Sequence, residues 1–505
     1  MNTQVRVRFA PSPTGGLHIG GVRTVLFNYL FAKKHNGTFV LRIEDTDQTR
    51  FVEGAEDYIF RCLAWCGLSP DESVLQPGEH APYRQSERKA IYWQYAQQLI
   101  TQGHAYYAFD TPEELEKMRE QHKSEQNPTP QYNHSLRKHM RNSLTMSEQE
   151  VAAALANNTP YVIRLKVPEN RLLSLQDMIR GAVSFDTNLV DDKVLLKADG
   201  MPTYHLANIV DDHLMETSHV IRGEEWLPSM PLHVLLYRAF GWEAPEFAHL
   251  PLILKPVGNG KLSKRDGDKL GFPVFPLDWT DPISGEKSSG YREKGFFPEA
   301  VINFLALLGW NDGTEKELFS LEELENAFDL SRVHKSGAKF DPEKNKWFNH
   351  QYLVKKDNTD LTRAFAPIVA KKGIDSCGIT KLEKIVSLIK ERAHFVEEFW
   401  DLSDYFFVAP TSYDEKASKN WNSATPALMQ ELISVLGEIT NFTAANIETI
   451  VKDWMTKNEI GMGKVMQPFR LSLVGTLKGP HLFDIVELIG KEETIKRIEK
   501  AIASL

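Results

Sequence analysis

The sequence predicts an α/β fold in which a parallel sheet is interrupted by an inserted α+β domain and followed by an all-α C-terminal half. Two observations support this prediction. Short apolar strands alternate with amphipathic helices near the N-terminus and again after residue 192, which is typical of a parallel sheet with right-handed crossovers. After about residue 296, segments with a 3.6-residue apolar repeat indicate helices through to Leu505.

The first block contains two strands and two helices. Residues 5–9 alternate with period two and are expected to form a strand, and a Pro- and Gly-rich turn separates them from a helix at residues 20–34. Residues 38–43 predict a second, buried strand, and residues 53–65 predict a second helix. We therefore expect these segments to build one half of the parallel sheet.

The strand–helix pattern returns later, at residues 193–197, 204–210, 219–221 and 231–240. The chain between the two blocks, about residues 103–192, differs in composition. It holds a polar stretch interrupted by prolines and a strand-like run at residues 161–167. We interpret it as a separate domain inserted into the sheet.

The helical half shows its repeat most clearly at residues 382–395, 427–436 and 483–502. Ahead of it, residues 275–291 are rich in Pro, Gly, Ser and charged side chains and are interpreted as an exposed surface loop. Nothing in the sequence indicates what this loop does.

Composition narrows the function classes. The formal net charge of −9 argues against a protein that coats nucleic acid non-specifically, although a local basic face would still be compatible with it. The three cysteines, Cys62, Cys66 and Cys377, exclude a disulfide framework and favour a reducing compartment. Cys62 and Cys66 are interpreted as a packed pair on one helix face. The N-terminus lacks the apolar core of a signal peptide and no run is long enough to span a bilayer, so a cytoplasmic protein without a membrane partner is expected.

Two short motifs predict the chemistry. Residues 11–21 place glycines and His18 between a strand and a helix, where backbone amides can approach phosphates. Residues 261–265 place Lys261 and Lys264 on a Gly-flanked loop, and lysine suits phosphate oxygens that move during a reaction. Alone, His18 would be interpreted as a turn-packing histidine and the basic loop as a solvated one. Together and in this order, they indicate a site that activates a carboxylate with ATP.

Other phosphate motifs do not fit. The first segment lacks the dinucleotide-binding glycine spacing, and Leu262 stands where a Walker loop requires Ser or Thr after its lysine. The two motifs resemble the signature pair of class I aminoacyl-tRNA synthetases. Further segments resemble the bacterial-type glutamyl-tRNA synthetase family over essentially the whole chain: residues 8–15, 41–47, 82–88, 202–208, 220–226 and 475–483.

The resemblance implies a domain order. Residues 1–102 and 193–255 would form a split, Rossmann-like catalytic domain, and residues 103–192 an inserted domain that binds the acceptor end of the tRNA. Residues 256–345 would carry the lysine loop and a stem-contact region, followed by a helical anticodon-binding region at residues 346–505.

The resemblance also implies site residues. His18, Lys261 and Lys264 would be catalytic, and ATP, accompanied by Mg²⁺, would contact Thr14, Gly15, His18, Gly20, Gly21 and Lys264. L-glutamate would contact Arg8, Ala10, Ser12, Glu44, Tyr204, Asn208 and Arg222. Glu44 would pair with the ammonium group, while Arg8 and Arg222 would offer planar forks to the side-chain carboxylate. Anticodon contacts would involve Arg392, Arg470, Pro480, Leu482 and Phe483, of which the arginines and the aromatic ring suit unstacked bases.

Two departures from the family pattern stand out. Gly21 occupies the place where the first signature of class I enzymes usually has a second histidine, a change common in the glutamyl branch. The insertion has no cysteines near residues 104–109, so no structural zinc is expected there, and no metal site is predicted elsewhere.

The sequence disfavours three rival functions. A glutaminyl enzyme is disfavoured because an arginine, Arg222, stands where that group looks uncharged, and because the C-terminal half is helical. A ligase that modifies a tRNA base would lack that half, and a non-catalytic tRNA-binding paralogue would be expected to have lost His18 or Lys264. The sequence predicts a monomeric glutamate–tRNA ligase acting on tRNA-Glu, and leaves open whether tRNA-Gln is also charged.

Overall fold

The computed structural model describes residues 4–505 apart from residues 126, 375 and 376. These residues form two compact units. Unit 1 comprises the chain up to Lys294 together with Pro298–Asn345, and unit 2 comprises Gly295–Phe297 and Lys346–Leu505. The predicted combination of a parallel-sheet α/β part and a helical C-terminal half is confirmed. Within the described residues, no helix is both long and apolar enough to cross a bilayer.

Unit 1 is built on a six-stranded sheet with the strand order β2-β1-β8-β9-β5-β6. Its strands are β1 (Arg6–Phe9), β2 (Thr38–Leu41), β5 (Leu172–Asp177), β6 (Gly181–Asp186), β8 (His219–Gly223) and β9 (Glu246–Leu250). Neighbours from β2 through to β5 run parallel, and only β6 is antiparallel to its partner. The register places Arg8 opposite Val40 and Arg222 opposite His249.

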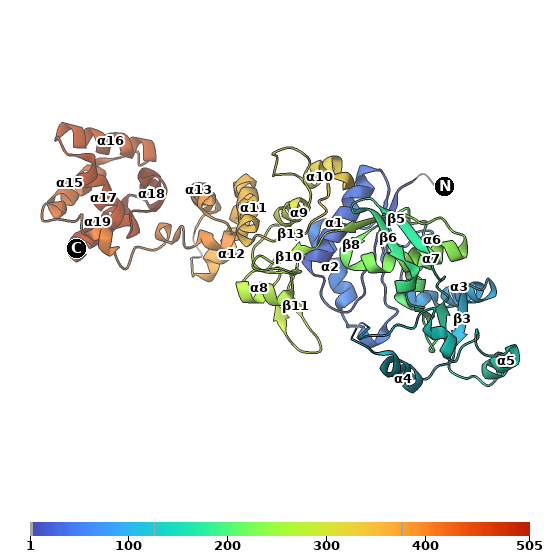
Figure 1. Ribbon diagram of the computed structural model, residues 1–505. Helices are drawn as coiled ribbons and strands as arrows, with labels where there is room; N and C mark the ends of the chain where they lie inside the picture. Colours follow the sequence, from blue (N-terminus) through green and yellow to red (C-terminus); the bar gives the residue numbers. More distant parts are fainter. Residues whose placement is uncertain (1–3, 126, 375–376) are drawn as a thin grey trace. The chain divides into compact units, whose positions relative to one another are not determined.

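Four helices accompany the parallel strands: α1 (Ile19–Lys34), α2 (Ala55–Cys66), α6 (Tyr204–Leu214) and α7 (Met230–Phe240). Helix α1 begins one residue before the predicted range because His18 caps it, and it buries Val22, Val25 and Leu26. The crossovers β1–α1–β2 and β8–α7–β9 run in opposite directions along the sheet. Right-handed crossovers therefore put α1 and α7 on opposite faces, as Figure 1 shows.

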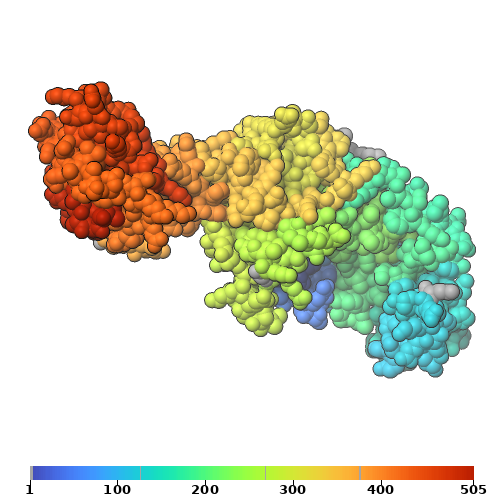
Figure 2. Space-filling view, turned by 60° about the vertical axis from the view of Figure 1, so that its left-hand side comes forward, coloured from blue at the N-terminus to red at the C-terminus, as the bar shows by residue number. Residues whose placement is uncertain are grey.

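The insertion contains α4 (Pro112–His122), α5 (Glu148–Ala156) and an antiparallel sheet of β3 (Ala105–Ala108), β4 (Val162–Leu165) and β7 (Val194–Leu196). Helix α3 (Lys89–Thr101) leads into it. The residues of the insertion that are coloured cyan form a projecting lobe in Figure 2.

Three strands differ from the prediction. Residues 193–197 were expected in the parallel sheet, but β7 pairs with β4 in the small sheet. The hairpin β5–β6, inside the predicted insertion, instead extends the large sheet from β9. Strand β5 buries every second side chain, so it can cover that edge.

Residues 275–291 were predicted as an exposed loop, and this is wrong for their base. They form a hairpin of β11 (Trp279–Thr280) and β12 (Lys287–Ser288). Phe275, Leu277 and Trp279 are buried, and Tyr58 donates a hydrogen bond of 2.5 Å to the Leu277 carbonyl. The apolar residues spread among Pro, Gly and Ser anchor the hairpin, while its tip stays exposed.

The remainder of unit 1 follows β9 along the chain. It contains β10 (Ile253–Leu254), α8 (Lys264–Leu270), α9 (Pro298–Leu307), α10 (Leu321–Ala327) and β13 (Ala338–Lys339). Strands β10 and β13 pair in parallel, and α9 and α10 both pack against α1.

Helix α11 (Pro342–Lys355) begins in unit 1 and continues in unit 2. Unit 2 continues with α12 (Asn358–Lys371), α13 (Ile379–Ile389), α14 (Glu415–Ser418), α15 (Thr425–Glu438), α16 (Ala444–Lys457), α17 (Met462–Val474), α18 (Leu482–Ile489) and α19 (Lys491–Ser504). One core cluster contains Phe365, Ile385 and Phe399, and a second contains Leu432, Phe469 and Phe483. The repeat at residues 483–502 is divided between two helices because Gly490 adopts φ +92° between them.

Candidate active site

A cavity of about 590 Å³ opens in unit 1 at the carboxyl ends of β1, β2 and β8. This edge of an open α/β sheet is where such folds bind ligands. The cavity brings together most of the site residues predicted from the sequence: Arg8, Ala10, Ser12, Thr14, His18, Gly20, Gly21, Glu44, Tyr204, Asn208, Arg222 and Lys261. Gly15 and Lys264 are not among its lining residues.

His18 is the N-cap of α1, and its Nδ1 accepts the Gly20 amide hydrogen at 3.1 Å. Its Nε2 is buried and has no hydrogen-bond partner among the described residues. Burial, with the nearby charge of Lys261, lowers the pKa of His18 to about 4. The imidazole is therefore neutral at pH 7. Because Nδ1 is an acceptor, the proton lies on Nε2, where it can be donated to a ligand.

The glycines of the first motif are needed for close packing. A Cβ on Gly16 would lie 2.8 Å from Cγ of Trp279, so the hairpin of residues 275–291 allows only glycine there. A Cβ on Gly21 would lie 2.7 Å from Cδ1 of Leu17, so a histidine at this position would require Leu17 to move. The hairpin thus shapes the loop that carries His18.

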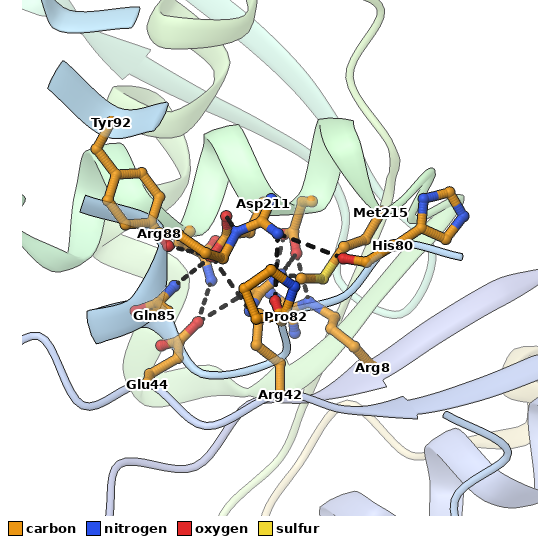
Figure 3. A network of polar contacts seen from close by, with 12 residues as sticks. Arg8, Arg42, Glu44, His80, Pro82, Gln85, Arg88, Tyr92, Asp211 and Met215 are labelled. Atoms are coloured by element: carbon orange, nitrogen blue, oxygen red, sulfur yellow. Dashed lines mark hydrogen bonds and ion pairs between the residues drawn. The ribbon is translucent and has the colours of Figure 1, made fainter. Parts of the chain in front are cut away.

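A buried ion-pair network holds one wall of the cavity (Figure 3). Asp212 accepts bonds from Arg8 through Nε at 3.0 Å and Nη2 at 3.1 Å, and from Arg42 Nη1 at 2.8 Å. Glu44 Oε1 accepts from Arg42 Nη2 at 2.8 Å and from Asn208 at 3.0 Å. Two donors of Arg8 that the sequence argument reserved for a substrate carboxylate are therefore engaged by Asp212.

Burial has opposite outcomes for the two carboxyl groups. It raises the pKa of Glu44, and the charges of Arg42 and Arg8 only partly offset this rise. For Asp212, the same two arginines overcome burial and lower the pKa below its ordinary value. Asp212 therefore stays ionised, whereas the protonation of Glu44 responds more readily to a change in the charges around it. Both hydrogen bonds that Glu44 accepts from the described residues go to Oε1, which leaves Oε2 of this cavity-lining residue for a ligand.

The network continues to Asp211, which accepts bonds from Gln85 at 2.9 Å, Arg88 at 2.7 Å and Tyr92 at 2.7 Å. Figure 3 shows these side chains converging on Asp211 from residues 85–92. The sequence reasoning missed Asp211, Asp212 and Arg42. Only Asp212 had a signal in the sequence, since it follows Tyr204 and Asn208 at intervals of four on one face of α6.

Arg222 differs from the other cavity arginines. Its Nε donates to Nε2 of His249 at 3.0 Å, and its Nη1 contacts the Tyr204 hydroxyl at 3.1 Å and Nδ1 of His233 at 3.2 Å. Its Nη2 donates to the Trp226 carbonyl at 3.4 Å. None of these four hydrogen bonds of Arg222 goes to a carboxylate, whereas Arg8 and Arg42 are both paired with acids. Burial lowers the pKa of Arg222, yet guanidinium stays charged.

The two lysines of the second motif form ion pairs at their loop. Lys261 lies 2.7 Å from Oε1 of Glu225, and Lys264 lies 2.8 Å from Oε2 of Glu286 at the hairpin tip. Lys261 reaches the cavity wall, but Lys264 is directed to the hairpin. Lys264 also begins α8, capped by Ser263 and Asp266.

In unit 2, Arg470 lies on α17 and Arg392 at the end of a short 3₁₀ helix, Lys390–Arg392. Nη1 of Arg470 and the hydroxyl of Tyr405 are buried without a hydrogen-bond partner among the described residues. Burial lowers the pKa of Arg470, and so does the charge of Arg392. The arrangement leaves buried polar atoms that a bound base could satisfy.

The other predicted anticodon residues behave differently. Pro480, Leu482 and Phe483 are buried, and Phe483 is fully enclosed in a core cluster. The expectation that the Phe483 ring offers a stacking surface is therefore wrong, because its faces are already packed. Within the described part of the chain, no group of three or more His, Cys, Asp or Glu side chains could hold a metal ion.

Comparison with known proteins gives matches over both units. Residues 4–347 match the family described as "tRNA synthetases class I (E and Q), catalytic domain". Residues 360–502 match the family described as "Anticodon binding domain". The glutamate–tRNA ligase of Flavobacterium johnsoniae is 72% identical over 505 residues, covering 100% of both chains. That of Christiangramia forsetii is 60% identical over 506 residues, again covering 100% of both.

Solved structures give the same result. A glutamate tRNA ligase from Elizabethkingia meningosepticum, determined in complex with its amino acid, superposes with a TM-score of 0.96 at 54% identity, covering 99% of this chain and 100% of that chain. The glutamate–tRNA synthetase of Elizabethkingia anophelis gives a TM-score of 0.94 at 54% identity with the same coverage. The resemblance predicted from the motifs is confirmed.

Proposed function

The chain belongs to the class I tRNA synthetases of the glutamate and glutamine group, and from this premise we propose that it ligates L-glutamate to tRNA-Glu with ATP. The observation that carries the choice of glutamate is Arg222, a buried cation at the cavity wall whose four hydrogen bonds to described residues all go to neutral groups. A neutral amide in place of the substrate carboxylate would leave that charge uncompensated.

Glutamate is assigned to the wall formed by β1, β8 and α6. Arg222 receives the side-chain carboxylate, and Oε2 of Glu44 receives the ammonium group. Tyr204 and Asn208 hold these two ion-pairing groups in place, since Tyr204 contacts Arg222 and Asn208 contacts Glu44. Arg8 retains Nη1 for the substrate, and Ala10 and Ser12 line the same cavity.

ATP is assigned to the glycine-rich loop, as a substrate complex with Mg²⁺. The Nε2–H of His18 is the buried donor for a phosphate oxygen, with backbone of Thr14, Gly15, Gly20 and Gly21 beside it. Lys261 and Lys264 supply positive charge after exchanging their present carboxylate partners for phosphate.

The reaction follows in two steps. An oxygen of the glutamate α-carboxylate attacks the α-phosphorus of ATP, and the bond to pyrophosphate breaks as glutamyl adenylate forms. A terminal ribose hydroxyl of the tRNA then attacks the activated carbonyl, loses its proton and displaces AMP. Neither step forms a covalent bond to the protein, so its contribution is positioning and stabilisation of the phosphate charge.

The tRNA is assigned to both units. Residues 103–192 would bind the acceptor end, residues 256–345 the stem and residues 346–505 the anticodon. In unit 2 the unsatisfied atoms of Arg470 and Tyr405, with Arg392, support base recognition. Pro480, Leu482 and Phe483 would shape this site from the core. We propose further that the enzyme is a cytoplasmic monomer.

The test is attachment of labelled glutamate to separately purified tRNA-Glu and tRNA-Gln transcripts in the presence of ATP. The Lys264→Ala variant is the control, and we expect it to lose orders of magnitude of adenylate formation while retaining tRNA affinity. Charging of tRNA-Glu alone supports a discriminating ligase, and charging of both supports a non-discriminating one. Failure to charge either transcript, when both are active with another synthetase, contradicts the proposal.

A further inference from the structure

The donors of Arg222 determine which nitrogens of its histidine neighbours carry protons. A guanidinium only donates hydrogen bonds, so an imidazole nitrogen that receives one must be unprotonated. Arg222 Nε lies 3.0 Å from Nε2 of His249, which places the His249 proton on Nδ1. That Nδ1 lies 2.6 Å from Oδ2 of Asp177, and the carboxylate accepts the proton's hydrogen bond.

The same argument applies on the other side of the guanidinium. Nη1 of Arg222 lies 3.2 Å from Nδ1 of His233, so the His233 proton is on Nε2. His233 Nε2 in turn lies 3.2 Å from Nδ1 of His205 and donates to it. Arg222 is therefore held by two neutral imidazoles in fixed tautomers.

The Asp177–His249 arm is rigid. Both residues are 0% exposed, and His249 stands directly opposite Arg222 in the pairing of β8 with β9. Asp177 ends β5, where Oδ1 also accepts the backbone amides of Ile179 at 3.0 Å and Arg180 at 2.8 Å. The carboxylate thus ties the turn of the β5–β6 hairpin to the imidazole that orients Arg222.

Neutral imidazoles and a carboxylate would affect the charge of Arg222 differently. A carboxylate in direct contact with Arg222 would orient it equally well but would neutralise the charge that a substrate carboxylate needs, as Asp212 does for Arg8. An imidazole acceptor fixes the guanidinium plane and leaves the charge available. A guanidinium has five N–H donors. On Arg222, four of them have partners among the described residues, which leaves one on Nη2 for a ligand.

We propose that His249 and Asp177 are positioning residues that set the preference for glutamate: Asp177 fixes the tautomer of His249, and His249 orients Arg222 toward the substrate side chain. This inference rests on the proposed function and extends it to two residues outside the cavity lining.

The test is glutamate-dependent exchange of pyrophosphate into ATP by the full-length enzyme, with His249→Leu and His249→Gln compared. In His249→Leu, Arg222 loses its acceptor, and we expect the glutamate KM to rise about tenfold to a hundredfold, while the ATP KM stays within about twofold. In His249→Gln, the amide oxygen can accept from Arg222 and should restore most of the affinity. Inhibition by glutamine should strengthen relative to glutamate affinity only in the leucine variant.

His219→Leu is the matched control, since His219 lies on β8 beside Phe31 and does not line the cavity. It should leave both KM values unchanged. A folded His249→Leu protein with an unchanged glutamate KM would overturn the inference, and a rise in the ATP KM of the same size would too. Absence of both exchange and charging of tRNA-Glu in the unsubstituted protein would instead contradict the proposed function.

A second measurement decides the case if the leucine variant does not fold. Long-range ¹H–¹⁵N correlation on histidine-labelled, unsubstituted protein reports which imidazole nitrogen is protonated. We expect His249 to carry its proton on Nδ1 and His233 on Nε2. A proton on Nε2 of His249 is incompatible with acceptance from Arg222 and would overturn the inference.

Discussion

At the scale of single residues, the cavity separates two kinds of arginine. Arg8 and Arg42 are paired with Asp212 and Glu44, whereas Arg222 is bonded to neutral groups. Removing Arg222 should therefore affect glutamate far more than ATP. For Arg222→Ala we expect the glutamate KM to rise by about a hundredfold or more, in line with ~2–5 kcal/mol for truncating one partner of a buried charge pair. Pyrophosphate exchange measured with glutamate and ATP varied in turn tests this expectation. An unchanged glutamate KM would contradict the assignment of Arg222 to the glutamate site.

Two histidines predict a dependence of stability on pH. Burial lowers the pKa of both His18 and His205 from 6.5 to about 4 in the folded protein. The unfolded chain therefore binds more protons between these values, so stability is complete above pH 6.5 and falls as the pH drops toward 4. Each histidine should contribute a slope of up to about 1.4 kcal/mol per pH unit. Urea unfolding at several pH values measures this slope. The stability of His205→Gln should depend measurably less on pH than that of the unsubstituted protein, and an identical slope would contradict the assignment.

The family resemblance predicted the residues that line the cavity better than it predicted how they pair with one another. Arg8, Glu44, Tyr204, Asn208 and Arg222 all line one cavity, as carried over from the motifs. Which arginine is neutralised could not be predicted, because it depends on where Asp212 lies once α6 packs against α3 and α7. The histidines that hold Arg222 lie 11 and 27 positions away in sequence and belong to no motif quoted for the site.

At the scale of elements, the hairpin of residues 275–291 connects the two signature segments. Its base packs against Gly16, and Glu286 near its tip pairs with Lys264. Breaking that pair should free the lysine for phosphate. For Glu286→Gln we expect the ATP KM to fall by up to about fivefold, because exposed ion pairs contribute only ~0.2–1 kcal/mol. Pyrophosphate exchange at low salt measures it, with the exposed Glu315→Gln as control; a higher ATP KM would mean that Glu286 instead assists the bound state.

The break between α18 and α19 predicts a second effect. Gly490 combines φ +92° with ψ 162°, a conformation that is essentially restricted to glycine, and no neighbouring atom would touch an added Cβ. Gly490→Ala should therefore cost about 1–3 kcal/mol of stability from backbone strain alone. Gly437→Ala on α15 is the matched control, since it also has open space but lies in a helix, where alanine should gain about 0.5–1 kcal/mol. Denaturant unfolding should show changes in stability of opposite sign for the two variants. Changes of the same sign would contradict the assignment of backbone strain to Gly490.

The elements that sequence periodicity placed wrongly are those decided by tertiary pairing. Strand β7 has the apolar run of a parallel strand, but β4 is its partner and the small sheet takes it. Strand β5 carries an alternating pattern that fits either sheet, and only the open edge of β9 decides the choice. By contrast, α1, α2, α6 and α7 were predictable because their apolar residues recur at helical spacing, although α7 is buried on all sides from Met230 to Tyr237.

At the scale of the whole molecule, each unit has its own hydrophobic core. A core cluster of unit 1 includes Leu173, Leu206 and Phe247, and the two clusters of unit 2 draw on residues 353–498. The net charge of −9 is thus a sum over two separately folded parts, and it does not describe the local surface that either part offers to RNA. The sequence predicted a change from strand–helix alternation to a helical repeat after about residue 296, whereas the two units divide at Asn345 and Lys346.

Separate cores predict separate unfolding. Glutamate and ATP are assigned to unit 1, so their binding free energy should stabilise that unit alone, by about 2.7 kcal/mol at a ligand concentration of 100 times Kd. In differential scanning calorimetry we expect two transitions, of which only one moves upward with glutamate and ATP. An RNA hairpin carrying the tRNA-Glu anticodon should move the other, and the Arg470→Ala variant should abolish that second shift while leaving the first intact. A single transition that moves as a whole with either ligand would show that the two cores unfold as one cooperative unit and would contradict the division drawn from their separate packing.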